Sequence, residues 1–126
     1  MSGRYEVAAT CSRAVPLTLP VNMPWKEIHP GIKLKVLWRD EESGASTVLF
    51  QFGPGTRAPL HEHMGVEQTF VLEGSFEDHD GKITAGNFAV REAGSLHAGF
   101  TSEGSLHLAF FSKPNRIIED DSEIRF

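Results

Sequence analysis

The sequence predicts an all-β protein with one antiparallel domain, built as a sandwich or a barrel. Twelve glycines and seven prolines divide its 126 residues into short segments rich in Val, Ile, Leu, Phe and Thr, the residues that favour strands. Turn signals recur at a spacing of about 8–12 residues, which is typical of antiparallel sandwiches and barrels. We find no segment with the apolar period of a helix. A chain of this length can bury a core without disulfides.

The turns that end each strand fix where the strands lie. We expect a strand over 33–38, ended by the charged turn that leads to Gly44, and a second over 46–52, ended by Gly53-Pro54-Gly55. A third covers 67–72 and stops at the corner Glu73-Gly74. The remaining strands are expected over 75–77 and 82–84 around the hairpin dipeptide Asp80-Gly81, over 88–91, from Leu96 onward, and over 106–112.

The two ends of the chain differ from this pattern. Residues 1–30 contain four prolines that exclude a long helix, so we expect an extended arm, followed by the barrel over 31–114 and a charged tail over 115–126. Apolar residues alternate along the arm, at Val15, Leu17, Leu19 and Val21. Such an arm can cover the edge of a sheet. We therefore expect a homodimer that exchanges arms, the alternative being an arm folded over its own barrel.

Composition and charge exclude several classes of protein. The net charge of −5 makes the protein a poor candidate for sequence-independent nucleic-acid binding, which needs a basic face, so we expect no nucleic-acid partner. No apolar run approaches the roughly 20 residues of a membrane helix, and residues 1–10 lack a signal pattern, so we expect a cytoplasmic protein without a membrane partner. The single cysteine, Cys11, excludes an internal disulfide and a thiolate zinc cage, and its surroundings favour an inert thiol.

Three histidines and one glutamate are the candidate metal-binding residues of the chain. His61 and His63 are one residue apart, so in a strand both side chains lie on one face. Glu67 shares its parity with Thr69 and Val71 on an apolar inward face, where a carboxylate is costly unless it is paired or binds a cation. With His97, these residues would make a nitrogen and oxygen site suited to Fe, Mn, Co, Ni, Cu or Zn. A His-x-His pair alone is weak evidence, since two surface histidines on a loop are common.

The spacing of these residues resembles the two motifs of the cupin superfamily. The first motif is met at every position, by Gly55, His61, His63, Glu67 and Gly74. The second is met by Gly86, Gly94 and His97, whereas Glu92 stands where proline is usual and Thr101 where asparagine is usual. The resemblance implies a cupin or jelly-roll barrel, a double-stranded β-helix, with one divalent transition metal held by His61, His63, Glu67 and His97.

Within the superfamily, the chain resembles the cupin-like domain of the anti-sigma factor ChrR and related single-domain proteins. The resemblance lies in the segments 67–74 and 93–97 and in Pro114-Asn115-Arg116. Relatives with this type of barrel include dioxygenases that cleave diketones or hydroxylated ketones. The helical, sigma-contacting domain of the anti-sigma factor has no counterpart in the proline-rich residues 1–30, so we do not expect the anti-sigma function here.

The other histidines and the large aromatic residues have simpler interpretations. His79 belongs to the turn around Asp80-Gly81. His107 shares its parity with Ala109 and Phe111, so it either faces the cavity as a relay or lies outward or at the edge of the core. The large aromatic residues are expected mainly in the core, with some at the mouth of the barrel: Trp38, Phe50, Phe52, Phe70 and Phe88.

These features together lead us to expect a small metal-dependent oxygenase that acts on a diketone or hydroxy ketone bound in the barrel. Fe(II) would be the metal of an oxygenase, whereas Zn, Ni or Mn would also suit the ligands. One alternative is a binding or sensing module without turnover. Another is an isomerase or lyase in which Glu67 acts as a catalytic base. The fold alone does not choose among them.

Overall fold

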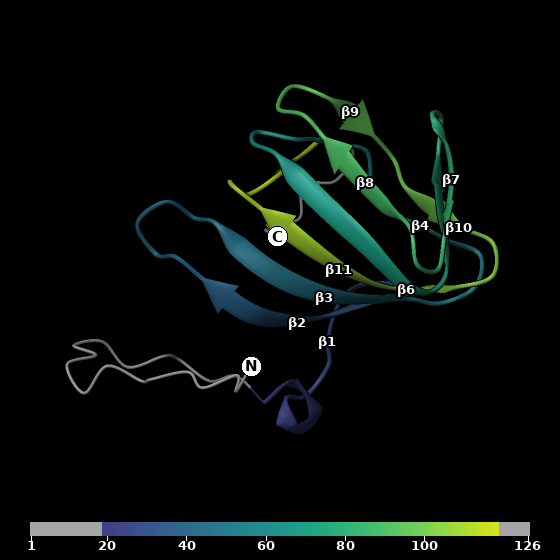
Figure 1. Ribbon diagram of the computed structural model, residues 1–126, viewed down its shortest axis with the longest axis horizontal. Helices are drawn as coiled ribbons and strands as arrows, with labels where there is room; N and C mark the ends of the chain where they lie inside the picture. Colours follow the sequence, from purple (N-terminus) through teal and green to yellow (C-terminus); the bar gives the residue numbers. More distant parts are fainter. Residues whose placement is uncertain (1–18, 119–126) are drawn as a thin grey trace, which may run out of the picture.

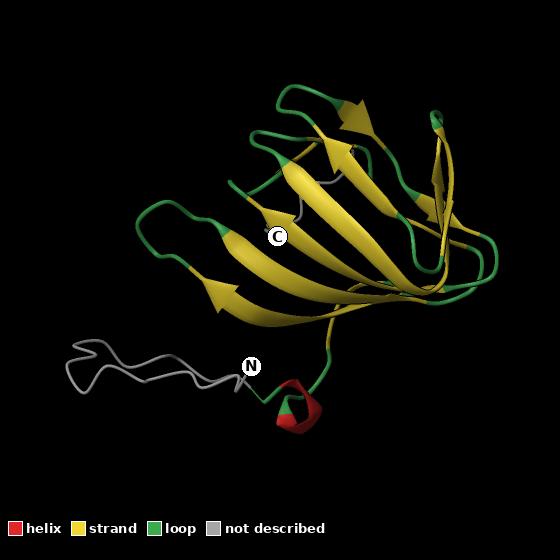
Figure 2. Cartoon of the chain, viewed as in Figure 1, coloured by secondary structure: helices red, strands yellow, loops and turns green. Residues whose placement is uncertain are grey.

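The computed structural model describes residues 19–118, which form an almost entirely antiparallel β structure (Figure 1). The one helical segment among them is a 3-10 turn, η1 (Pro20–Asn22), ahead of the first strand (Figure 2). The predicted all-β fold is therefore confirmed. Cys11, Val15 and Leu17 lie outside the described residues, as does the end of the predicted tail, 119–126.

The strands belong to two sheets. They are β1 (Lys26–His29), β2 (Ile32–Arg39), β3 (Ser46–Phe52), β4 (Thr56–Arg57), β5 (His61–Glu62), β6 (Glu67–Asp78), β7 (Gly81–Thr84), β8 (Phe88–Arg91), β9 (Leu96–His97), β10 (Phe100–Thr101), β11 (Ser105–Phe111) and β12 (Arg116–Ile117). The larger sheet has the order β1-β2-β3-β11-β6-β10-β4, with β7 and β8 also paired to β6. The smaller sheet has the order β12-β5-β9. The large sheet curls around the interior, as Figure 1 shows.

The long strand β6 departs from the sequence-based expectation. Its predicted end at the Glu73-Gly74 corner is not seen, and it continues to Asp78. Gly74 has a φ of 73°, which L side chains rarely adopt, and a Cβ there would overlap the carbonyl oxygen of Gly104. The glycine thus lets β6 cross close to the chain at Gly104. β6 pairs with β11 and β8 before this point and with β7 and β10 after it.

Alternating side chains of the central strands build the core. On β3, Val48, Phe50 and Phe52 are buried, and their neighbours Thr47, Leu49 and Gln51 are not. The strands beside it contribute Ile32 and Leu34 from β2, Val71 and Phe76 from β6, and Ala109 and Phe111 from β11. Burial of these side chains stabilises the fold by roughly 1.5–3 kcal/mol for each large residue.

Three aromatic residues expected in the core lie at the surface instead. Trp38, Phe70 and Phe88 expose 45%, 42% and 53% of their area, whereas Phe50 and Phe52 are buried as predicted. Phe70 lies between the inward residues Thr69 and Val71, so its side chain is on the outer face of the sheet. Phe88 is its cross-strand partner and shares that face. Within residues 19–118, no helix has the length and apolar character needed to cross a membrane.

Candidate metal centre

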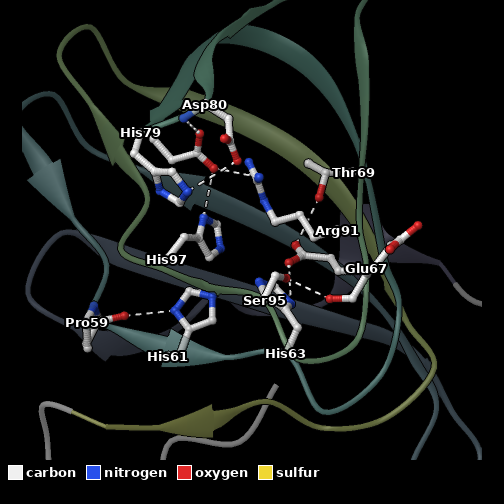
Figure 3. Close-up of polar contacts among 12 residues, drawn as sticks. Pro59, His61, His63, Glu67, Thr69, His79, Asp80, Arg91, Ser95 and His97 are labelled. Atoms are coloured by element: carbon white, nitrogen blue, oxygen red, sulfur yellow. Dashed lines mark hydrogen bonds and ion pairs between the residues drawn. The ribbon is translucent and has the colours of Figure 1, made fainter.

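Four buried side chains from three parts of the chain meet at one point. His61 on β5 and His97 on β9 are direct cross-strand partners, and Glu67 opens β6. His63 follows β5 and is tied to the turn before β9, since its N–H donates to Ser95 O at 2.9 Å and its carbonyl accepts from Gly94 N at 2.7 Å. One ligand atom of each of the four residues lies within 4.8 Å of the others, an arrangement visible in Figure 3.

The three imidazole rings pack tightly against one another. The ring centroids of His61 and His97 are 4.4 Å apart, those of His63 and His97 4.8 Å, and those of His61 and His63 4.9 Å. All three residues are at most 5% exposed, and Glu67 is 8% exposed. Four polar side chains are thus enclosed together with little access to solvent.

Hydrogen bonds determine which ring nitrogen of His61 and of His97 carries the lone pair that a metal ion would bind. His61 Nδ1 lies 2.8 Å from the carbonyl oxygen of Pro59, and His97 Nδ1 lies 3.1 Å from Asp78 Oδ2. A carbonyl or carboxylate oxygen accepts a hydrogen bond from Nδ1–H, so the lone pair of each ring is on Nε2. This is the state in which metal-binding histidines are held.

His63 lacks such a partner. It is fully buried, and among the described residues neither ring nitrogen has a hydrogen-bond partner. Its Nδ1 lies 3.3 Å from Glu67 Oε1, which is close enough for an ion pair. A buried polar group without a hydrogen bond costs about 1–3 kcal/mol, and a cation bound by the ring would remove that cost. The buried histidine and glutamate side chains could therefore hold a metal ion.

Burial sets the charge of the site. It lowers the pKa of His63 to about 4 and that of His97 to about 3, with the charges of His61 and Arg91 acting in the same direction. Burial raises the pKa of Glu67 to about 7, against the hydrogen bond that Thr69 Oγ1 donates to Oε2 at 2.9 Å. The imidazoles are therefore neutral at pH 7, as metal binding requires, and Glu67 needs a nearby positive charge to remain ionised.

Sequence reasoning missed two residues next to the site, Asp78 and Arg91. Asp78 directly precedes the predicted turn around Asp80-Gly81, yet its side chain is only 2% exposed and contacts both His97 and Arg91. Burial raises the pKa of Asp78, but the N–H of Asp80 and the charge of Arg91 outweigh this and lower it. His79 is exposed, and Asp80 N donates to Asp78 Oδ1 at 2.8 Å in the turn. The proximity of Asp78 to His97 depends on the full length of β6, which the sequence did not reveal.

His107 lies inside the barrel, not on its outer side. It is 3% exposed, its ring stacks on Phe50 at 5.2 Å, and its Nδ1 lies 2.8 Å from Ser105 Oγ. Burial lowers the pKa of His107 to about 3. With His61, Glu67, His97 and the aromatic core residues, it lines a cavity of about 20 Å³, which also includes Asn115. Phenylalanine side chains thus line this cavity together with histidines, Glu67 and Asn115.

Comparison with known protein families identifies the family of this chain. A family model described as the ChrR cupin-like domain matches residues 17–115. The chain belongs to this family. A search of curated proteins gave no match.

Solved structures agree with the cupin fold. A candidate acetylacetone dioxygenase from Methylibium petroleiphilum is similar with a TM-score of 0.79 and 20% identity, over 91% of this chain and 92% of that one. An acetylacetone dioxygenase from Acinetobacter johnsonii gives 0.72 and 21%, over 98% and 90%. The Rhodobacter sphaeroides complex of SigE with the anti-sigma ChrR gives 0.65 and 25%, over 71% of this chain and 50% of that one. The chain therefore spans half of the matched chain of the ChrR complex.

Proposed function

We propose that this cupin binds one divalent transition metal through His61, His63, Glu67 and His97. The observation that carries the proposal is His63, which is fully buried with neither ring nitrogen in a hydrogen bond among the described residues. The neutral histidines and the carboxylate give a mixed nitrogen and oxygen donor set, which suits Fe(II), Mn, Ni and Zn. Four protein ligands leave one or two positions open in a five- or six-coordinate site, as catalytic sites do.

We further propose that the protein is a metal-dependent oxygenase acting on a diketone or hydroxy ketone. Support comes from the neighbours named as acetylacetone dioxygenases, together with a donor set that accommodates Fe(II). A bound metal ion would supply Lewis acidity and, as Fe(II), redox chemistry with dioxygen. The chain itself contributes an interior from which water is largely excluded, lined by Phe50, Phe52, Phe76 and Phe111. The cavity holds about 20 Å³, roughly one water-sized molecule, so a carbonyl substrate requires side chains around the site to move.

Two other activities remain as alternatives at the same site. A binding or sensing module needs the metal and a ligand but no turnover. An isomerase or lyase would use Glu67 as a base, and its raised pKa of about 7 suits that role. The binding module keeps all four proposed metal ligands, whereas the isomerase or lyase would need Glu67 to release the metal, and measurements of turnover separate the two.

The experiment is anaerobic reconstitution with Fe(II), followed by oxygen uptake with a panel of diketones and hydroxy ketones. An oxygenase consumes oxygen in proportion to product, and the rate disappears in Glu67→Ala and without iron. Ligand binding without product or oxygen uptake, for Fe, Mn and Ni alike, would favour the binding module. Product formed without oxygen uptake would favour the isomerase or lyase.

We also propose that the protein forms a homodimer in the cytoplasm. The outer face of β6, β8 and β11 carries a group of exposed apolar side chains that register aligns: Phe70, Leu72, Phe88, Val90 and Phe110. Contiguous apolar patches of this kind mark interaction surfaces. A second copy presents the same apolar side chains, so a two-fold contact would bury both groups. Leu19 and Val21 of the arm are exposed as well, and the partner could cover them.

A further inference from the structure

A buried carboxylate connects the proposed metal ligand His97 to a buried arginine. Asp78 is at the end of β6, and its side chain is 2% exposed. Its Oδ2 accepts from His97 Nδ1 at 3.1 Å and from Arg91 Nη1 at 2.5 Å. Its Oδ1 accepts the backbone N–H of Asp80 at 2.8 Å.

Stability alone does not require the histidine in this arrangement. A buried carboxylate is costly unless it is paired and hydrogen-bonded, but Arg91 and the Asp80 N–H would already satisfy Asp78. His97 nevertheless shares the oxygen that Arg91 binds. The buried His97 ring is 4% exposed and neutral, so it carries one proton. Because Nδ1 faces the Asp78 carboxylate, that proton is on Nδ1 and the lone pair is on Nε2.

We infer that Asp78 is the positioning residue for His97: it fixes the Nδ1–H tautomer and the ring plane so that Nε2 faces the other ligands, while Arg91 anchors Asp78. The inference rests on the proposed metal site. Partners of this kind commonly orient metal-binding histidines, and their loss typically costs 10–100-fold in metal affinity. His61 has a backbone acceptor, the Pro59 carbonyl, whereas the acceptor at His97 Nδ1 is a side chain that a substitution can remove.

Asp78 also balances the charge of Arg91. The guanidinium is 12% exposed and lies near enough to the histidines to disfavour their protonated forms. The same positive charge would repel a metal cation if Asp78 did not neutralise it. Loss of the carboxylate therefore has two consequences, a released imidazole and an unpaired buried cation, and the experiment must separate them.

The test compares Zn²⁺ affinity, measured by competition with a chromophoric chelator, in five forms of the full chain. Asp78→Ala should bind 10–100-fold more weakly than the wild type. Asp78→Asn keeps an acceptor oxygen beside Nδ1 but not the charge that balances Arg91, so its affinity should lie between those of the wild type and Asp78→Ala. The double variant Asp78→Ala/Arg91→Ala removes the unpaired cation as well and should stay weak. Asp80→Ala is the matched control, since its side chain is exposed, and it should bind like the wild type.

A second readout uses no metal. Long-range ¹H–¹⁵N NMR spectra of the metal-free protein should show His97 as the Nδ1–H tautomer in the wild type and in Asp78→Asn, and as a mixture in Asp78→Ala. An Nε2–H tautomer in the wild type would overturn the inference even if Asp78→Ala failed to fold. Wild-type affinity in Asp78→Ala, or its full recovery in the double variant, would overturn it while leaving the metal site intact. A wild type that binds no metal would overturn the proposed function first, and the positioning role with it.

Discussion

His61 and His97 face each other across the β5–β9 ladder, with their ring centroids 4.4 Å apart. The pair joins the two cupin motifs, since His61 comes from the first and His97 from the second. The backbone N–H and carbonyl of His63 also form hydrogen bonds with the turn before β9. The relative position of the imidazoles is thus determined by main-chain pairing, which side-chain substitutions at the ligands should leave intact.

His63→Ala should remove most of the bound metal. The variant loses one of the four proposed ligands, a buried imidazole whose ring nitrogens make no hydrogen bond within the described residues. We expect the rise in melting temperature on adding Zn²⁺ or Fe(II) to disappear, while the metal-free variant still unfolds cooperatively. Metal content by mass spectrometry and thermal unfolding measure this. His79→Ala is the control, because His79 is exposed. Full occupancy in a His61→Ala/His63→Ala variant would contradict the proposed site.

Metal affinity should depend on pH through Glu67. Burial lowers the pKa of His63 and His97 to about 4 and about 3, so these rings are already neutral at pH 6. Glu67, with its pKa raised to about 7, is protonated there and must release a proton to bind the metal. We expect the association constant to fall about tenfold for each pH unit below 7. Affinity measured between pH 5.5 and 8 tests this. Glu67→Gln should bind more weakly and lose the dependence, and an unchanged slope in that variant would contradict the assignment.

The metal-free protein should gain stability when Glu67 is neutralised. Its pKa is raised from 4.5 to about 7 in the folded state. The stability this group contributes is complete below pH 4.5 and is lost as the pH rises through 7. Glu67→Gln should therefore raise the free energy of unfolding at pH 8 by on the order of 3 kcal/mol, with little change at pH 4.5. Urea unfolding at the two pH values measures this. The exposed Glu73 on the same strand supplies the control Glu73→Gln, and equal effects of the two substitutions would count against a buried carboxyl.

Phe88→Glu should disrupt the proposed dimer. The substitution places a charge on the apolar outer face beside Phe70, where association would bury it without a partner. Light scattering at micromolar concentration should give a dimer mass for the wild type and a monomer mass for the variant. Ile118→Glu, an exposed site away from that face, should leave the dimer intact. A monomeric wild type would contradict the proposal, and a dimer that is lost only on deleting residues 1–24 would point to arm exchange instead.

The strands and the four proposed ligands could be predicted from the sequence, whereas the residues that surround the ligands could not. Strands 46–52 and 88–91 were predicted at their observed bounds because Gly and Pro turns end them. The four proposed ligands follow a fixed spacing, so they could be named without the structure. Asp78 and Arg91 could not, because their contact joins the ends of two strands. The exposure of Phe70 and Phe88 was also missed, since aromatic residues on an outer face look like core residues in a one-dimensional pattern.

The course of β6 around Gly74 has a consequence for Asp78. Before Leu72, the inward residues of β6 have odd numbers, as Glu67, Thr69 and Val71 do. The ladder with β11 pairs Val71 with His107 and Glu73 with Leu106, so Leu72 is an extra residue in β6, and beyond it the side chains of Ser75, Phe76 and Asp78 are enclosed. Such an insertion shifts the alternation of the pleat, and it lets one strand carry a proposed ligand at its start and the carboxylate beside His97 at its end. A residue with no atom in the cluster thereby determines whether its two acidic groups face the same interior.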